Sequence, residues 1–138
     1  MSEFHNLINS NLFQGRIFFD KSLENLTWLK VGGRASCLYI PKNKKDLAVF
    51  LKQINNKVKI NVFGRLSNVL IRDGGISGVT ILIPPSFSEI EIHRNNKITL
   101  SSGMLDKNVS KLAFDNNLGG FEFLSGIPGN IGGAIAMN

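Results

Sequence analysis

The part of the chain best suited to binding chemistry is a glycine-rich segment at residues 119–138, in which six residues are glycine and only Glu122 is charged. Pro128 restricts its own φ and favours an extended residue before it, so Gly126-Ile127-Pro128-Gly129 is typical of a rigid turn between two apolar runs. The adjacent Gly132-Gly133 leaves backbone N–H groups without side chains over them. Amides beside apolar walls suit a large, flat, anionic ligand, although a purely structural turn is the alternative interpretation.

A second loop of small polar residues, Gly64–Asn68, directly follows a predicted strand. Backbone amides can point into such a loop, and the side chains of Ser67 and Asn68 can donate hydrogen bonds to phosphate oxygens. The spacing matches neither a Walker loop nor the G-x-G-x-x-G dinucleotide fingerprint, so a simple turn is again the alternative. A third break in the pattern, Ser101–Gly103, precedes a predicted helix. Three such loops on one domain can converge on one extended ligand.

Side chains that could carry out a reaction by themselves are scarce. The sequence has no group of His, Cys, Asp and Glu at metal-binding spacing, and its two histidines, His5 and His93, belong to no Ser-His-Asp set. None of the carboxylates forms an obvious acid–base pair. Loops that can hold a ligand without catalytic side chains are typical of a cofactor domain, in which the cofactor brings the reactivity.

The composition is that of one soluble globular domain, with 138 residues of which 43% are apolar and 19% charged. The net charge of +6 predicts either a solvated surface or attraction of an anionic ligand such as a nucleotide, and no nucleic-acid motif is present. No apolar run approaches the roughly 20 residues of a membrane helix, and the N-terminus has no signal-peptide pattern. Cys37 is the only cysteine, which excludes an internal disulfide, fits a cytoplasmic location and predicts an inert core thiol.

The elements that must position these loops follow from hydrophobic periodicity. Residues 1–21 are predicted to form an arm, partly helical, that packs on a body formed by residues 22–138. In that body, Arg34–Ile40 is rich in β-forming residues. Asn43 can cap a helix whose apolar residues recur three and four apart as far as Ile54.

A strand is predicted next at Lys57–Phe63, where Val58, Ile60 and Val62 alternate with polar residues and so would share one face. Strand, helix and strand within about 30 residues indicate a small βαβ unit.

Shorter elements are predicted in the rest of the chain. Strands are expected at Val69–Ile71 and Val79–Ile83. Glu89–Leu100 has the alternation of a hairpin that turns at Asn95-Asn96, with His93 at its polar tip. A final helix is expected to start at a cap formed by Asp106 and to end before the glycine-rich segment.

Three segments in this order resemble one known family. They are Leu26–Gly33, Phe63–Gly75 with its Gly-Arg-Leu-Ser-Asn loop, and Gly120–Asn138 with Gly-Ile-Pro-Gly-Asn-Ile-Gly-Gly-Ala. Each piece is short, but the combination is highly specific, and over about residues 22–138 the chain is similar to the UDP-N-acetylenolpyruvoylglucosamine reductase family. These enzymes are the bacterial UDP-N-acetylmuramate dehydrogenases of peptidoglycan synthesis.

The resemblance implies an α+β protein with a vanillyl-alcohol-oxidase-type FAD-binding fold, in which two α+β subdomains hold FAD between them and a C-terminal substrate domain is missing here. In the family, a Gly-x-Gly-Ser-Asn loop holds the FAD pyrophosphate and a Gly-Ile-Pro-Gly segment lies against the flavin. By match, the residues implied in FAD binding are Gly64, Arg65, Leu66, Ser67, Asn68, Gly103, Gly126, Ile127, Pro128, Gly129, Ile131, Gly132, Gly133 and Ala134.

The family's activity implies an oxidoreductase that uses FAD, with NADPH as hydride donor and a UDP-sugar as substrate, and with neither nucleic acid nor membrane as partner. The expected reaction is reduction of UDP-N-acetylenolpyruvoylglucosamine to UDP-N-acetylmuramate. The family's catalytic Arg, Ser and Glu are expected beyond Asn138, so the resemblance assigns no catalytic residue in this chain. The chain is therefore expected to be the FAD-binding part, inactive alone. The alternatives are a non-catalytic flavin- or nucleotide-binding module from a truncated or decayed gene, and a basic interaction protein that uses its glycine loops only as turns.

The sequence departs from the family at the second glycine of the phosphate loop, which is Leu66 here. If that position needs a positive φ, a leucine costs about 1 kcal/mol or more in backbone strain. The departure predicts weak FAD binding.

Overall fold

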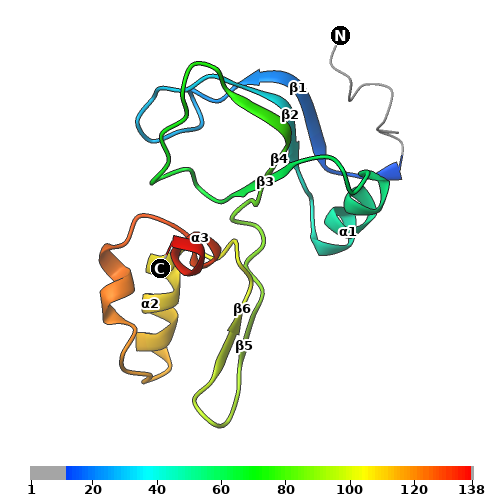
Figure 1. Ribbon diagram of the computed structural model, residues 1–138. Coiled ribbons are helices and arrows are strands. Elements are labelled where there is room, and N and C mark those ends of the chain that lie inside the picture. The colour runs from blue at the N-terminus through cyan, green and yellow to red at the C-terminus, as the bar shows by residue number, and fades with distance from the viewer. Residues whose placement is uncertain (1–11, 138) are drawn as a thin grey trace. The chain divides into compact units, whose positions relative to one another are not determined.

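The computed structural model describes residues 12–137, and the chain divides into two compact units, Met1–Pro84 and Pro85–Asn138. Among the described residues, the first unit is built on a four-stranded sheet in the order β1-β2-β4-β3 (Figure 1). Strand β1 runs antiparallel to β2, whereas β2, β4 and β3 run parallel to one another. The elements of this unit are β1 (Arg16–Ser22), β2 (Arg34–Ile40), α1 (Lys44–Gln53), β3 (Ile60–Phe63) and β4 (Ile76–Leu82).

The two central strands carry the most buried residues of the sheet. In β2 these are Cys37–Tyr39, and in β4 they are Val79–Ile81. Consecutive buried residues are typical of strands that are covered on both faces, as parallel strands usually are. The predicted strand–helix–strand unit is confirmed as β2–α1–β3, but β4 lies between its two strands.

Strand β1 lies in the segment that the sequence assigned to the arm. It pairs with β2 from Arg16↔Ile40 to Ser22↔Arg34, so this part of the arm is a sheet strand rather than a helix. Residues 1–11 of the predicted arm lie outside the described residues. The division of the chain into an arm, residues 1–21, and an FAD-binding domain, residues 22–138, stays a prediction.

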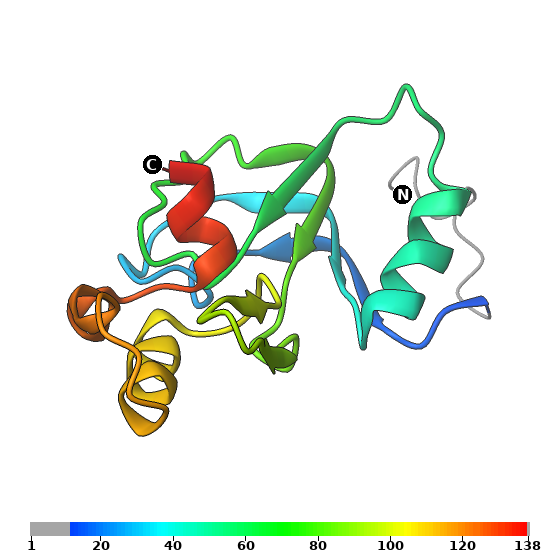
Figure 2. The same ribbon diagram turned by 90° about the horizontal axis from the view of Figure 1, so that it is seen from below.

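Helix α1 is fixed at its start by a set of hydrogen bonds. The side chain of Asn43, the predicted N-cap, accepts a hydrogen bond from the amide of Asp46 at 2.9 Å. The Asp46 carboxylate accepts from the Tyr39 hydroxyl at 2.7 Å and from the Gln14 amide at 2.6 Å. The Phe50 ring stacks on Tyr39 with 3.7 Å between ring centroids. These contacts hold α1 at the end of the sheet where β2 finishes, as Figure 2 shows.

Strand β3 alternates as predicted, but its inner face is the opposite one. Ile60 and Val62 are 41% and 61% exposed, whereas Asn61 and Phe63 are half-buried. Phe63 is the largest apolar side chain of the strand and packs against the core, so it takes the inward face. With a period of two, that choice turns Ile60 and Val62 outward.

The predicted strand at Val69–Ile71 is wrong, because these residues form an irregular loop between β3 and β4. The loop packs against the core of the first unit, since Ile71 is only 6% exposed and belongs to its core cluster. A short apolar run does not by itself distinguish a strand from a buried loop.

The second unit carries both of its predicted elements. They appear as β5 (Ile90–Ile92), β6 (Ile98–Leu100) and α2 (Asp106–Asp115), and the glycine-rich segment adds the 3₁₀-helix η2 (Glu122–Gly126) and α3 (Ile131–Met137). Strands β5 and β6 form the predicted antiparallel hairpin, and Asn96 turns the chain with a φ of 58°. No helix within residues 12–137 is both long and apolar enough to cross a membrane.

The predicted cap of α2 is wrong. The N-cap is Leu105, in an extended conformation, and Asp106 is the first helical residue. A tertiary contact explains the shift, because Leu105 forms a β-bridge with Asn130 that holds it extended. The Asp106 carboxyl group is consequently buried instead of capping the helix.

Candidate functional site

The loop Ser101–Gly103 and the glycine-rich loop Gly126–Gly133 lie against each other in the second unit. The Asn130 side-chain amide donates to the Ser102 carbonyl at 2.8 Å, and the Gly132 amide donates to the same carbonyl at 2.9 Å. We refer to this arrangement as the Ser102–Asn130 contact. Two of the three loops predicted to share a ligand are therefore adjacent.

Backbone hydrogen bonds extend this contact on both sides of Asn130. The Ile131 amide donates to the Met104 carbonyl at 2.9 Å, and the Asp106 amide donates to the Gly129 carbonyl at 3.3 Å. The glycine-rich loop is thus bound to the start of α2 as well as to Ser102. Its position is set by residues almost 30 positions earlier in the sequence.

The expectation of a bare amide at Gly132 is corrected by this geometry. Its N–H is used by the Ser102 carbonyl, and a Cβ at Gly132 would lie 2.8 Å from the Ser102 Cβ. A Cβ at Gly133 would lie 3.2 Å from the Asn130 side-chain oxygen. Close packing between the two loops therefore requires glycine at position 132, whereas a side chain at position 133 would crowd Asn130 within the same loop. Whether Gly132 and Gly133 also contact a cofactor stays a prediction.

The exposed part of the glycine-rich loop is its first half. Gly126, Ile127 and Pro128 are exposed, and a Cβ at Gly126 would meet nothing within 4 Å. The Ile127 amide donates to the Leu124 carbonyl at 3.3 Å, and the Gly129 amide donates to the Ile127 carbonyl at 3.1 Å. With these amides satisfied internally, the turn presents an apolar surface that a planar ring can lie against.

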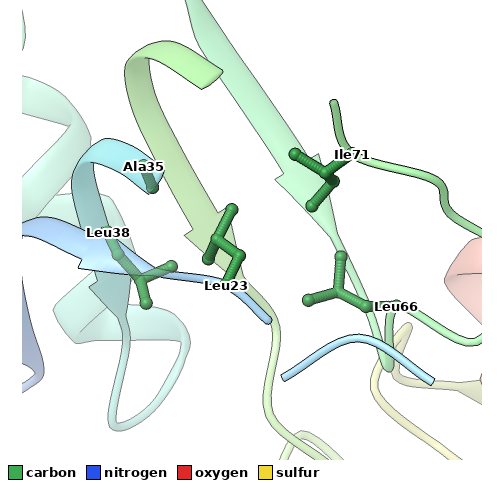
Figure 3. Packing of buried hydrophobic residues seen from close by; sticks show 5 residues of the cluster. All are labelled: Leu23, Ala35, Leu38, Leu66 and Ile71. Carbon is green, nitrogen blue, oxygen red and sulfur yellow. The ribbon is translucent and has the colours of Figure 1, made fainter. Parts of the chain in front are cut away.

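The loop Gly64–Asn68 belongs to the first unit and contains one unusual backbone conformation. Leu66, which stands where the family has glycine, has a φ of 54°. This is the left-handed conformation that glycine adopts more easily than leucine. Its side chain is only 4% exposed and lies in the apolar core cluster of this unit. Figure 3 shows that cluster, formed by Leu23, Ala35, Leu38, Leu66 and Ile71.

The residues next to Leu66 are more exposed than Leu66 itself. Arg65 and Asn68 are exposed and Ser67 is half-buried, so polar groups remain available at the loop surface while Leu66 is in the core. These are the residue types that can bind phosphate oxygens. The convergence of this loop with the two loops of the second unit stays a prediction.

Two of the segments that carried the family resemblance are bound to each other in the first unit. The Trp28 amide donates to the Leu66 carbonyl at 3.3 Å, and the Gly33 amide donates to the Arg72 carbonyl at 3.2 Å. Gly75 has a φ of 73° and its amide donates to the same Arg72 carbonyl at 2.9 Å. Trp28, which is 59% exposed, was not among the predicted site residues, and its exposure beside this loop could not be read from the sequence.

The buried titratable groups of residues 12–137 include Cys37 in the first unit and Asp106 in the second. No group of His, Cys, Asp and Glu side chains there could hold a metal ion. Burial raises the pKa of Asp106, whose two carboxyl oxygens have no hydrogen-bond partner. Burial raises the pKa of the Cys37 thiol to about 11, which agrees with the predicted inert core cysteine.

A hollow of about 710 Å³ lies elsewhere in the second unit, between α2 and η2. Its lining includes Lys111, Phe114 and Phe121 and none of the residues predicted to bind the cofactor. The predicted site and this hollow are therefore separate features.

Comparison with known proteins agrees with the resemblance seen in the sequence. The FAD binding domain family matches residues 35–138. The reductase named UDP-N-acetylenolpyruvoylglucosamine reductase from Orientia tsutsugamushi (strain Ikeda) is 50% identical over 119 residues, which cover 84% of this chain and 39% of that protein. The protein of the same name from Rickettsia canadensis (strain McKiel) is 46% identical over 127 residues, covering 92% of this chain and 43% of that protein.

A solved structure is similar as well. The crystal structure of UDP-N-acetylenolpyruvylglucosamine reductase from Thermus caldophilus superposes with a TM-score of 0.66 at 25% sequence identity, covering 88% of this chain and 41% of that one. The chain therefore has the α+β FAD-binding fold that the resemblance implied, and it spans about two fifths of the length of the relatives that it matches.

Proposed function

We propose, from the premise that this chain belongs to the FAD binding domain family, that its glycine-rich loops are the surfaces that hold FAD. The observation that carries the proposal is the Ser102–Asn130 contact. It joins Ser101–Gly103 to Gly126–Gly133, two loops far apart in the sequence that were implied in FAD binding separately.

The chemistry of each loop supports a different part of the cofactor. The exposed apolar turn at Gly126–Pro128 suits the isoalloxazine ring. The exposed Arg65 and Asn68 suit the pyrophosphate, since a guanidinium and an amide can both donate to phosphate oxygens. Burial of Leu66 in the core keeps its side chain out of that surface. The other residues implied by the resemblance complete the proposed FAD-binding set.

We further propose that the chain is the FAD-binding part of a cytoplasmic UDP-N-acetylenolpyruvoylglucosamine reductase, the name carried by relatives 46–50% identical to it. FAD, when bound, supplies hydride transfer, here from NADPH to the enolpyruvyl double bond of a UDP-sugar. The residues of this chain bind and orient FAD, and no catalytic side chain is assigned among them.

The single tryptophan allows a direct test of FAD binding. Trp28 is bonded through its amide to Leu66 of the proposed pyrophosphate loop, so bound FAD should quench its fluorescence. We expect saturable quenching with a dissociation constant in the micromolar range, and no saturation with free riboflavin, which lacks the pyrophosphate. Unquenched fluorescence at about 100 μM FAD, well above a dissociation constant of that order, would contradict the proposal.

A chimera tests the reductase activity. The chain is joined to the remaining part of the Orientia tsutsugamushi reductase, with which it shares 50% identity. We expect substrate-dependent oxidation of NADPH by the purified, yellow chimera. A chimera that binds FAD but does not turn over would favour the second candidate, a non-catalytic flavin-binding module.

A further inference from the structure

One side chain, that of Asn130, contributes a hydrogen bond to the Ser102–Asn130 contact. Asn130 is only 4% exposed, and its side-chain amide donates to the Ser102 carbonyl at 2.8 Å. The other hydrogen bonds across the contact all come from backbone amides. Asn130 is therefore the position at which a substitution can alter the contact without changing the backbone.

Asn130 also makes backbone contacts with α3 and with the residue before α2. It directly precedes α3, and its own carbonyl accepts from the Ala134 amide at 3.0 Å. The β-bridge with Leu105 passes through the same residue. Asn130 thus joins three features, which are the glycine-rich loop, the loop at Ser102 and the start of α2.

The two glycines after Asn130 show how closely the loops fit. Any side chain at Gly132 would overlap Ser102, where a Cβ would be 2.8 Å from the Ser102 Cβ and 3.0 Å from its carbonyl oxygen. A Cβ at Gly133 would press on the Asn130 side-chain oxygen at 3.2 Å. Only glycine therefore fits at position 132 while the two loops keep this arrangement.

We propose that Asn130 is a positioning residue for FAD: its amide fixes the turn Gly126–Gly129 relative to Ser101–Gly103, so that both loops meet the cofactor in one geometry. This inference rests on the proposed function, and it concerns binding rather than chemistry. A preorganised loop loses less conformational entropy when its ligand binds. Loss of the Asn130 hydrogen bond should therefore weaken FAD even in a fully folded protein.

The test compares Asn130→Ala with Asn116→Ala in the full chain. Asn116 makes the same kind of bond, since its side-chain amide donates to the Leu112 carbonyl at 2.8 Å, but it lies at the other end of α2. Alanine is preferred to aspartate because a new carboxylate would repel the anionic cofactor by itself. We expect the dissociation constant for FAD to rise about tenfold in Asn130→Ala and to stay within about twofold in Asn116→Ala.

A second measurement separates positioning from stability. The visible circular dichroism of bound flavin reports the surroundings of the ring, and at saturating FAD it should differ between Asn130→Ala and the unmodified chain. Far-UV circular dichroism, recorded well below the melting temperature, confirms that each variant is folded. If Asn130→Ala does not fold, Asn130→Ser, which keeps a shorter hydroxyl donor, replaces it with the same expected direction.

The outcomes distinguish this inference from the proposed function. An unmodified chain that does not bind FAD would overturn both. Normal binding by the unmodified chain, together with unchanged affinity and an unchanged flavin spectrum in Asn130→Ala, would overturn only the positioning role. Equal losses in Asn130→Ala and Asn116→Ala would also overturn it, because the effect would then be a general loss of stability.

Discussion

Leu66 shows how one residue can break a motif and still suit the fold. Its φ of 54° costs about 1–2 kcal/mol for a residue with a Cβ. Its side chain is only 4% exposed, and this burial stabilises the folded state by about 1.5–3 kcal/mol. The backbone strain at Leu66, which the sequence predicted, is thus offset by burial of the Leu66 side chain in the folded chain. Weak binding of FAD at this loop stays a prediction.

We expect Leu66→Gly to destabilise the chain, although it restores the residue that the family carries. Glycine relieves the strain, but removal of the buried side chain costs about 2–5 kcal/mol, so the net loss should be about 1–3 kcal/mol. Urea unfolding measures this difference. Leu70→Gly is the control, because Leu70 is 71% exposed in the same stretch of chain. A Leu66→Gly chain as stable as the unmodified one would show that the side chain does not contribute to the core.

Asp106 supports a second prediction at the residue level. Burial raises its pKa above the usual 3.8, so the folded state prefers the protonated form. Asp106 therefore lowers the free energy of unfolding as pH rises from about 4 through the folded-state pKa. Below that pH range it has no such effect. We expect Asp106→Asn to raise the melting temperature at pH 7 by a few degrees, which is about 1 kcal/mol, and to leave it unchanged near pH 3.

Asp115→Asn provides the matched control for Asp106→Asn. Asp115 is an exposed acid at the opposite end of α2, and its substitution should change the free energy of unfolding by less than about 0.5 kcal/mol. A loss of stability in Asp106→Asn at pH 7 would show that the carboxylate has a favourable partner in solution, contrary to this structure.

At the level of elements, α1 and α2 begin with acids in opposite situations. Both Asp46 and Asp106 are buried, but Asp46 accepts hydrogen bonds from the Tyr39 hydroxyl and from the amides of Gln14 and Lys42. Burial by itself would raise the pKa of Asp46, but these hydrogen bonds outweigh it and lower the pKa below its usual 3.8. Asp46 therefore fixes α1 to the sheet. Asp106 does not cap α2, because the bridge between Leu105 and Asn130 makes Leu105 the N-cap.

For Asp46→Asn we expect a loss of about 1–3 kcal/mol in the free energy of unfolding at pH 7, because donors that face the carboxylate lose their charged acceptor. The pH dependence has a definite sign. A lowered pKa contributes stability above the unfolded-state pKa, and this contribution disappears as pH falls through the folded-state pKa. The difference in stability between the unmodified chain and the variant should therefore start to narrow as pH falls below about 4 and should narrow further as pH falls through the lower folded-state pKa. Urea unfolding at pH 7 and pH 3 measures this, and a constant difference would contradict it.

At the level of the whole molecule, the charge favours an anionic ligand. The chain carries 16 Lys and Arg against 10 Asp and Glu, for a net charge of +6. A net positive field raises the association rate of anions, and salt screens it over a Debye length of about 10 Å at 0.1 M. The charge does not specify FAD, but it predicts how FAD binding should respond to salt.

We expect the association rate of FAD to fall several-fold between about 0.05 M and 0.5 M NaCl, as screening removes the long-range attraction. Stopped-flow quenching of Trp28 measures this rate. AMP, which is a smaller anion, should compete less well with FAD at high salt. An FAD rate that is independent of salt would show that the net charge plays no part in capture.

Local patterns in the sequence were sufficient for the elements that depend on neighbouring residues. Strand β2, the Asn43 cap of α1 and the hairpin that turns near Asn96 were all predicted, because propensity, capping and turn chemistry act over a few residues. The three motif segments likewise determined the family, since their order and spacing are properties of the sequence itself.

Only the tertiary structure decided what depends on distant partners. The place of β4 between β2 and β3, the inward face of Phe63 and the cap at Leu105 each follow from contacts between residues far apart in the chain. The Gly132 amide is the clearest case at the candidate site. As a motif residue it offered a free donor, but in the fold it donates to the Ser102 carbonyl, because packing of the two loops brings that carbonyl within hydrogen-bond distance.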